Sequence, residues 1–411
     1  MPSDARGGGL KPIPKISCIM VITNKIRPIT LADYQKIAKQ TDRNKREGLG
    51  GLRFPLLGLF GEVGSLLSEL KKKQRDKESY YAYDTALVEE FGDVLWYFTN
   101  IAGRAGLALE ELAGLALDEL AIGGKARPSR VRTFADLQAK APHTGPTSDA
   151  PFETEALRLA ASVGSLLGDV DSYVRNRELL KGHLVEIFRS IIRSAEDANI
   201  LIDDVVRANI AKVTGRWPID PVYTPLFDLE MKPDEQLPRR IEMLIEEQTV
   251  GGKTFVIQKC KGIKIGDRLT DNKTEQDDYR FHDVFHLGYA AVLGWSPVIR
   301  GQFRVKRKSI PEIDENQDGA RAALIEEGVA TWVFNHSLRL DYFADITALD
   351  FALLKAIREL VEGYEVADCP LWMWEKAILE GFKAFRFLRK HRRSLVIADL
   401  NKRRLIVRKA S

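Results

Sequence analysis

The sequence predicts a mainly α-helical protein with a C-terminal α+β domain, and three observations support this fold class. Apolar residues recur at helical spacing between about Pro55 and Ala121. Helical patterns return after residue 150 and partly repeat those of the first segment. Beyond residue 218, alternating segments flanked by glycines are mixed with further helical patterns.

Length and composition set the limits of this prediction. A chain of 411 residues is too long for one ordinary core, so two or three domains are expected. The net charge of +4 is nearly balanced and indicates no particular partner. Three cysteines far apart form neither a disulfide framework nor a thiolate metal site, which suits a cytoplasmic protein. No apolar run approaches the roughly 18 residues of a membrane span.

Changes in composition divide the chain into five segments. We expect an N-terminal arm over residues 1–29 and a helical bundle over 30–122, followed by a linker rich in Gly, Pro and Ser over 123–150. A second helical region is expected over 151–217 and an α+β domain over 218–411.

The first bundle is predicted helix by helix. A capping pattern, Thr30-Leu-Ala-Asp33, begins the first helix. Further helices are expected over residues 55–73, 80–104 and 109–121. Because the loops between them are short, the helices should form an antiparallel bundle.

The C-terminal domain shows both kinds of periodicity. A hairpin is expected over residues 253–265, and two short strands with a turn at Asn401-Lys402 are expected over 394–407. Four helices are expected between them, at residues 279–293, 319–338, 350–363 and 371–389.

Acidic residues gather on two of the first helices. Glu62, Ser65 and Glu69 lie at offsets of three and seven, which puts them on one stripe of a helix. Glu90 and Asp93 share a face of the next helix. Four carboxylates that converge in this way repel one another unless a cation lies between them. Hard oxygen ligands suit Mg²⁺, with Mn²⁺ as the alternative.

These motifs resemble a known family. The run Gly61-Glu-Val-Gly64, the pair Lys71-Lys72 and the run Glu89-Glu-Phe-Gly-Asp-Val-Leu-Trp-Tyr97 are similar to the signature of the MazG-like nucleoside triphosphate pyrophosphohydrolases. The resemblance covers about residues 31–122. It implies an all-α bundle that binds Mg²⁺ through an ExxE and an ExxD pair. The implied reaction hydrolyses nucleoside triphosphates to a monophosphate and pyrophosphate.

The resemblance also implies roles for single residues. Glu62, Glu90 and Asp93 match metal ligands, and Lys71 and Lys72 match a basic pair that meets phosphate oxygens.

Trp96 and Asn100 lie on the same side of the helix as Asp93 and are candidates for contact with the base or sugar, although Trp96 is equally well explained as a core aromatic. Ser65 stands where the family has its second ExxE glutamate, and Glu69 is the expected substitute ligand.

A bound metal would explain the chemistry. Magnesium neutralises the phosphate chain and lowers the pKa of a bound water, which attacks phosphorus in line. Glu69 and Glu90 are the catalytic candidates, with Glu69 orienting that water as the base.

The second helical region repeats landmarks of the first. Val63–Leu67 (VGSLL) recurs as Val163–Leu167, and Leu107–Leu112 has a counterpart in Ile200–Val205. Residues 151–217 are therefore predicted to be a degenerate copy that packs on the first as an intramolecular pseudo-dimer.

This copy is expected to keep only one acid of the first, Asp169 in the place of Glu69. Ser162 stands for Glu62, and Ile187 and Ser190 are aligned with Glu90 and Asp93.

A second metal site is an open alternative in the C-terminal domain. His282 and His286 are spaced to share one helix face, and Glu327 can supply a third ligand to Zn²⁺ or Fe²⁺. Asp283 replaces the glutamate of related protease motifs. The interpretation that the sequence favours is that the two histidines are hydrogen-bonded core residues. The basic run near residues 304–308 is read as a solvated face, so nucleic acid is not an expected partner.

The leading hypothesis is a Mg²⁺-dependent hydrolase of (d)NTPs that acts in nucleotide-pool cleaning or in depletion under stress or phage attack. It would be cytoplasmic and homo-oligomeric. One alternative is a nucleotide sensor with a weakened N-terminal site. Another is a C-terminal metallohydrolase built on the HDxxH motif, with the helical repeats as a scaffold.

Overall fold

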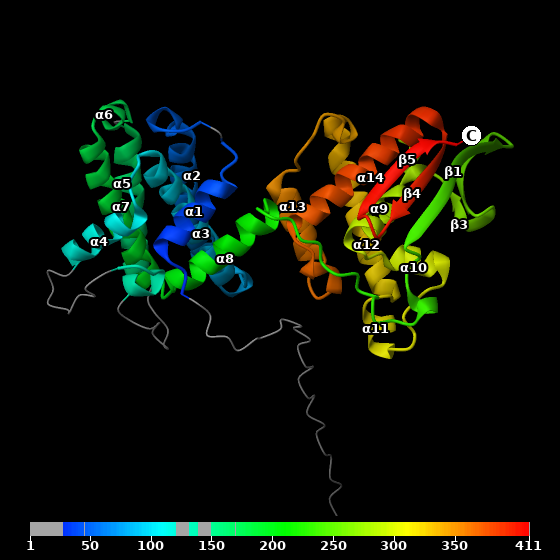
Figure 1. Ribbon diagram of the computed structural model, residues 1–411, viewed down its shortest axis with the longest axis horizontal. Coiled ribbons are helices and arrows are strands. Elements are labelled where there is room, and N and C mark those ends of the chain that lie inside the picture. The colour runs from blue at the N-terminus through cyan, green and yellow to red at the C-terminus, as the bar shows by residue number, and fades with distance from the viewer. Residues whose placement is uncertain (1–27, 45, 121–130, 139–148, 169, 411) are drawn as a thin grey trace, which may run out of the picture. The chain divides into compact units, whose positions relative to one another are not determined.

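The computed structural model describes residues 28–410 except 45, 121–130, 139–148 and 169. The chain divides into two compact units, residues 1–210 (unit 1) and 211–411 (unit 2), and each is described by itself (Figure 1). The predicted N-terminal arm lies almost wholly outside the described residues, and so does Asp169.

Unit 1 is all helical in the residues described. Its first helix begins after Thr30 because the Thr30 hydroxyl accepts a hydrogen bond from the Asp33 amide at 3.0 Å, as the capping pattern predicted. The helices are α1 (Leu31–Thr41), α2 (Arg53–Asp76), α3 (Tyr83–Arg104), α4 (Leu109–Leu120), α5 (Asp149–Gly168), α6 (Val170–Arg175), α7 (Arg177–Asp197) and α8 (Ile202–Arg216), with a 3-10 turn η4 (Phe134–Leu137) before α5.

A single hydrophobic core joins the predicted bundle to the region after it. α5 packs against α2, and α7 packs against α3 and α4. The rings of Phe98 on α3 and Phe188 on α7 lie 5.0 Å apart, and those of Phe91 and Phe152 lie 6.0 Å apart. The boundary between the units falls after Ile210, inside α8, and not at residue 217 as the composition suggested.

Two matching hexapeptides meet in unit 1. Thr30–Gln35 (TLADYQ) and Thr133–Gln138 (TFADLQ) each begin a helical turn, and Thr30 and Thr133 form an isolated antiparallel bridge. The Leu31 amide donates to the residue 132 carbonyl at 2.9 Å, and the Phe134 amide donates to the residue 29 carbonyl at 3.4 Å. Because both bonds join equivalent positions of the two hexapeptides, they are related by an approximate two-fold axis.

The helix ends match as well. Gly106 (φ 69°) follows the C-cap of α3 and Asn199 (φ 58°) follows the C-cap of α7, and both adopt the left-handed conformation that closes a helix. Gln35 donates to the residue 107 carbonyl and accepts from the Leu109 amide, at 2.9 and 3.0 Å. Gln138 makes the same two bonds to residues 200 and 202, each at 2.8 Å.

These contacts support the predicted repeat but move its limits. Residues 131–138, expected in the linker, supply the first turn of the second copy. The shift of 93 residues from Gly106 to Asn199 places His183 opposite Glu90 and Glu186 opposite Asp93. The alignment of Ile187 and Ser190 with these acids was therefore wrong, because it ignored where the two helices end.

Unit 2 is an α+β domain, as predicted. Its antiparallel sheet has the strand order β3-β2-β1-β4-β5. The strands are β1 (Arg240–Val250), β2 (Lys253–Cys260), β3 (Ile263–Leu269), β4 (Arg393–Asp399) and β5 (Arg404–Lys409). Both predicted hairpins are confirmed, β2–β3 and β4–β5. The central strand β1 was missed.

Helices cover the sheet of unit 2 (Figure 1). α9 and α14 lie side by side and pack against β4 and β5. They approach closely at Gly288, where a Cβ atom would lie 3.0 Å from the Ala377 carbonyl oxygen. The helices are α9 (Asp283–Leu293), α10 (Pro297–Phe303), α11 (Pro311–Asn316), α12 (Ala320–Ser337), α13 (Phe351–Leu360) and α14 (Leu371–His391). Among the described residues, no helix is long and apolar enough to cross a membrane.

Candidate functional site

Three carboxylates meet between α2 and α3. These consecutive helices pack along each other, and they bring Glu62, Glu90 and Asp93 together. One oxygen atom from each residue lies within 4.8 Å of the others, and all three side chains are partly exposed. The helical spacing thus correctly predicted that these acids converge.

The second copy supports this cluster. On α8, the Asn209 side-chain amide donates to Asp93 Oδ1 at 3.3 Å, and its carbonyl oxygen accepts from the Tyr34 hydroxyl at 2.9 Å. Gly92 leaves room for Asn209, since a Cβ at residue 92 would lie 2.9 Å from the Asn209 Cβ. Burial, and then the charge of Asp93, hold the pKa of Tyr34 well above its usual value. The sequence did not indicate Tyr34 or Asn209 as part of this site.

Glu69 lies outside the cluster formed by the described residues. It stands two turns, about 10 Å, along α2 from Glu62, so both cannot bind one ion directly. Its buried carboxylate accepts hydrogen bonds from Lys72 Nζ at 2.6 Å and from the Tyr80 hydroxyl. Burial, and then Glu69, raise the pKa of Tyr80 above its usual value. The prediction that Glu69 takes the place of the metal ligand missing at Ser65 is therefore wrong.

The two lysines differ in their surroundings. Lys71 is exposed, whereas Lys72 forms the ion pair with Glu69 and lies over the Tyr80 ring. The Lys72 side chain is 41% exposed. Contact of either lysine with phosphate stays a prediction.

A cavity of about 750 Å³ opens beside the C-terminal half of α3, between α1 and residues 42–48. Asn100 and Thr99 line it, and the buried Thr99 hydroxyl has no hydrogen-bond partner in the part of the chain that is described. Trp96 does not line it: its buried indole N–H donates to Thr41 Oγ1 at 3.0 Å. The core explanation of Trp96 is therefore favoured, and Asn100 remains a candidate for substrate contact.

The corresponding place in the second copy has different chemistry. His183 bonds the Tyr173 hydroxyl at 2.8 Å, and Glu186 pairs with Arg189. Ser162 stands where Glu62 stands in the first copy. Among the residues described here, these side chains form no metal-binding group.

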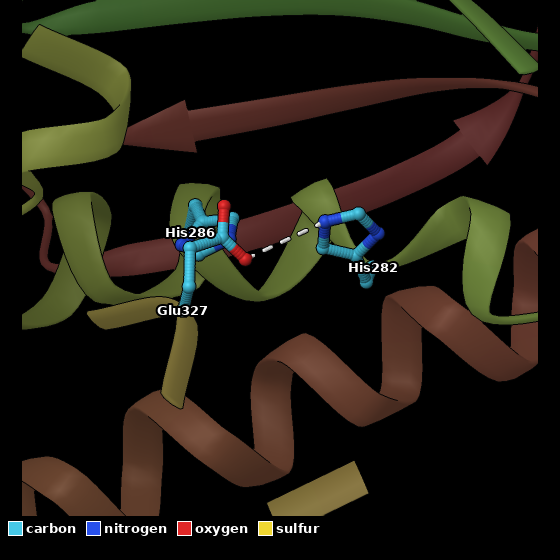
Figure 2. Close-up of side chains that lie close together, drawn as sticks. All are labelled: His282, His286 and Glu327. Carbon is cyan, nitrogen blue, oxygen red and sulfur yellow. Dashed lines mark ion pairs between the residues drawn. The ribbon is translucent and has the colours of Figure 1, made fainter. Parts of the chain in front are cut away.

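A second group of potential ligands lies in unit 2. His282 and His286 project from the start of α9, and Glu327 projects from α12 (Figure 2). Glu327 Oε2 lies 3.7 Å from His282 Nε2 and 3.4 Å from His286 Nε2. The prediction from the sequence that these three residues lie together is confirmed.

The Nδ1 atoms of both histidine rings are hydrogen-bonded to other groups of the protein. His282 Nδ1 lies 2.9 Å from the Tyr279 carbonyl oxygen, and His286 Nδ1 lies 2.8 Å from Glu326 Oε1. Glu326 is fully buried and also accepts from the Ser296 hydroxyl at 2.6 Å and the Val298 amide at 2.9 Å. Because each Nδ1 faces an acceptor, it is the nitrogen that carries the proton in the neutral ring. His286 Nε2 then faces Glu327, and His282 Nε2 lies between Asp283 Oδ1 at 3.2 Å and Glu327 Oε2.

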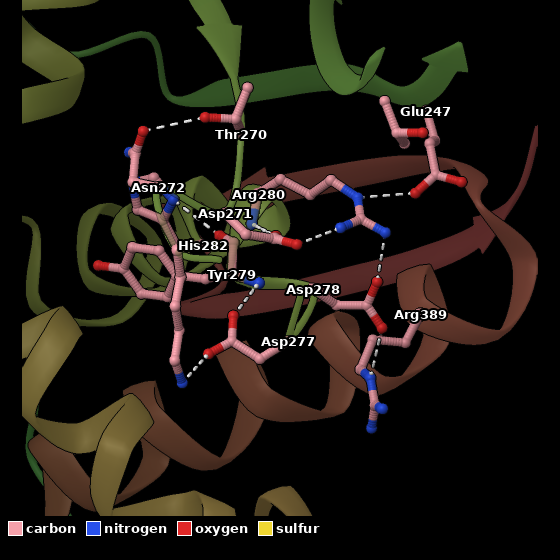
Figure 3. Close-up of polar contacts among 12 residues, drawn as sticks. Glu247, Thr270, Asp271, Asn272, Asp277, Asp278, Tyr279, Arg280, His282 and Arg389 are labelled. Atoms are coloured by element: carbon pink, nitrogen blue, oxygen red, sulfur yellow. Dashed lines mark hydrogen bonds and ion pairs between the residues drawn. The ribbon is translucent and has the colours of Figure 1, made fainter. Parts of the chain in front are cut away.

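An ionic network fixes the start of α9 (Figure 3). The buried guanidinium of Arg280 binds Asp271, Asp278 and Glu247, and the Asp271 carboxylate also accepts from the Arg280 amide at 2.9 Å. Tyr279 stacks on the His282 ring with centroids 4.4 Å apart. The ring of His282 is thus held from both its edge and its face.

The electrostatics of this group favour a positive charge. Burial alone lowers the pKa of His286, but the carboxylates of Glu326 and Glu327 outweigh burial and hold that pKa well above its usual value. Asp283 stands in the position of a protease glutamate. Its Oδ2 accepts from Gln258 and Gln302, and its Oδ1 lies 3.2 Å from His282 Nε2.

Comparisons with known proteins add a family to this geometry. Residues 222–411 match the family model described as the MazG C-terminal domain. The match covers less than half of the chain, so it shows a MazG-type C-terminal domain in this segment. A domain of this family suggests a nucleotide pyrophosphohydrolase-like role. The match covers the segment expected to be an extension, so it places MazG character in unit 2, whereas the MazG-like motifs lie at residues 31–122.

One curated relative and the solved structures complete the comparison. The Gene 37 protein of Mycobacterium phage L5 is 30% identical to this chain over 76 residues, which are 18% of the chain and 67% of the phage protein. No solved structure was found to match.

Proposed function

We propose that unit 1 hydrolyses nucleoside triphosphates to monophosphates and pyrophosphate with a divalent cation held by Glu62, Glu90 and Asp93. The observation that carries this proposal is the convergence of three carboxylates within 4.8 Å. Carboxylates so close repel one another, and a cation between them removes that repulsion. An all-oxygen ligand set with room for water and phosphate suits Mg²⁺.

The cavity beside α3 offers room for the base and sugar of a bound nucleotide. Asn100 lies seven residues, about 10 Å, beyond Asp93 on α3, so the cavity and the carboxylates are separated by roughly the length of a nucleotide between its base and its phosphates. The unpartnered Thr99 hydroxyl offers hydrogen bonding to a base or sugar. Lys71 is exposed on α2 and is the candidate cation for contact with the phosphates.

The chain's own groups perform the positioning. Bound Mg²⁺ would supply charge neutralisation and a water of lowered pKa. Asn209, held by Tyr34, fixes the orientation of Asp93. Glu69, held by Tyr80 and Lys72, is too far along α2 to share an ion with Glu62, but it can accept a proton from a water between them.

The test is pyrophosphate release by the full-length protein over a panel of (d)NTPs with Mg²⁺. Glu90→Gln and Asp93→Asn should each reduce kcat at least 100-fold, as expected when a metal ligand that acts in the transition state is lost. Glu89→Gln is the matched control, one residue away on the same helix and outside the cluster, and it should keep near wild-type activity. Equal activity of Glu90→Gln and Glu89→Gln would contradict the proposal.

A nucleotide sensor is a second candidate. Ser65 is a poor magnesium ligand, and Glu69 does not replace it in the cluster. If this weakens metal binding, wild-type protein will bind a nonhydrolysable triphosphate with Mg²⁺ and release no pyrophosphate. Binding that is lost in Glu90→Gln but kept in Glu89→Gln would favour the sensor over the enzyme.

A further inference from the structure

We propose that unit 2 carries a separate transition-metal site, in which His282 Nε2, His286 Nε2 and the Glu327 carboxylate bind one divalent ion such as Zn²⁺ or Fe²⁺. This site is independent of the carboxylate cluster in unit 1. It would add a second metal-dependent activity to the chain.

The first argument is a buried nitrogen atom whose only contact with Glu327 is a long ion pair. The His286 ring is fully buried, and its Nε2 has no hydrogen bond among the described residues, although Glu327 Oε2 lies 3.4 Å away. A buried polar atom without a hydrogen bond is unfavourable, so such atoms are rare unless a ligand satisfies them. A metal ion between Nε2 and the carboxylate satisfies both.

The second argument is the hydrogen bonding behind the rings. Histidines that bind metals almost always donate their other N–H to a carboxylate or a backbone carbonyl. His286 does the first through Glu326 and His282 the second through Tyr279. The remaining bonds of Glu326, to Ser296 and Val298, prevent it from turning toward the ion itself.

The third argument is the donor set. Two imidazoles and one carboxylate suit zinc and iron better than magnesium, which prefers oxygen ligands. Three protein ligands leave at least one coordination position for water or substrate. The Glu327 side chain is 40% exposed, whereas both histidines are buried, so the open position faces solvent on the side of Glu327. This is the arrangement of a catalytic ion and not of a closed structural one.

The test uses full-length protein carrying Glu90→Gln and Asp93→Asn, so that the unit 1 cluster does not contribute. Co²⁺ and Zn²⁺ are titrated calorimetrically, and the visible absorption of bound Co²⁺ is recorded with Mg²⁺ as the comparison. We expect one Co²⁺ per chain, with an absorption spectrum typical of nitrogen ligation, and no comparable Mg²⁺ binding.

Ligand variants separate a metal site from a buried ion pair. Glu327→Gln, at the exposed ligand, should preserve the fold and abolish Co²⁺ binding, and His286→Asn should do the same if it folds. Glu326→Gln should weaken Co²⁺ binding about 10–100-fold, as the loss of an outer hydrogen bond does. His336→Asn, on the same helix as Glu327 but outside the group, should bind like its parent. Absence of Co²⁺ binding, or equal binding by Glu327→Gln and His336→Asn, would overturn the proposal.

Discussion

Replacing Gly92 by alanine tests how the second copy supports the carboxylate cluster. Gly92 precedes Asp93 on α3, and a Cβ there would lie 2.9 Å from the Asn209 Cβ and 3.1 Å from its amide nitrogen. Cβ atoms essentially never lie so close, so α8 must move away from α3. The movement would lengthen the 3.3 Å hydrogen bond from Asn209 to Asp93.

Two opposing effects set the size of the change. Overpacking a core contact costs about 1–3 kcal/mol. Alanine is favoured over glycine inside a helix by about 1 kcal/mol. The net destabilisation of unit 1 should be about 1 kcal/mol, which corresponds to about a fivefold rise in the unfolded population. Weaker support of Asp93 should also reduce Mg²⁺ affinity.

Hydrogen exchange measured by mass spectrometry on the full-length protein separates unit 1 from unit 2. Peptides from α3 should lose protection in Gly92→Ala. Gly182→Ala on α7 is the matched control, because nothing lies within 4 Å of its new Cβ, and it should gain protection. Equal gains in both variants would refute the packing of Asn209 on Gly92.

Two other perturbations give distinct outcomes. Ser65→Glu restores the missing acid of the ExxE pair, so it should tighten Mg²⁺ binding about tenfold, or about 1.4 kcal/mol. Without metal, the added negative charge should lower the stability of unit 1. Calorimetry that shows an unchanged Mg²⁺ affinity would mean that Ser65 does not face the ion. Burial raises the pKa of Asp228, but hydrogen bonding from a backbone amide and the charges of Arg300 and Arg239 outweigh it, so the pKa is lowered overall. A lowered folded-state pKa gives stability that is present above the unfolded value of about 3.9 and is lost as the pH falls below it. The melting temperature of unit 2 should therefore fall more steeply below about pH 4 in the wild type than in Asp228→Asn. Equal slopes of melting temperature against pH would contradict this.

Local spacing was enough to predict the acids and the histidines. Offsets of three or four residues on a helix decide which side chains share a face, and this correctly grouped Glu90 with Asp93 and His282 with His286. The same reasoning was wrong for Glu69, because a shared stripe says nothing of the distance along the axis. Two helical turns separate it from Glu62.

Contacts far apart in sequence could not be predicted in this way. Tyr34 and Asn209 are 175 positions apart, and no periodicity connects them. The first turn of the second copy was taken for a linker because the 3-10 turn η4 spans only four residues, too few for a helical pattern to show. The central strand β1 was missed because its second half is only partly buried and its polar residues hide the alternation.

The two-fold pairing of Thr30 with Thr133 lies within one polypeptide, so a single substitution changes only one of the two halves. In a dimer of identical subunits every substitution changes both sites at once. Here each half can vary alone, so His183 and Arg189 could replace the chemistry of their counterparts while Glu90 and Trp96 kept theirs. What the second half supplies to the first is then support and not a second site, above all Asn209 against Asp93.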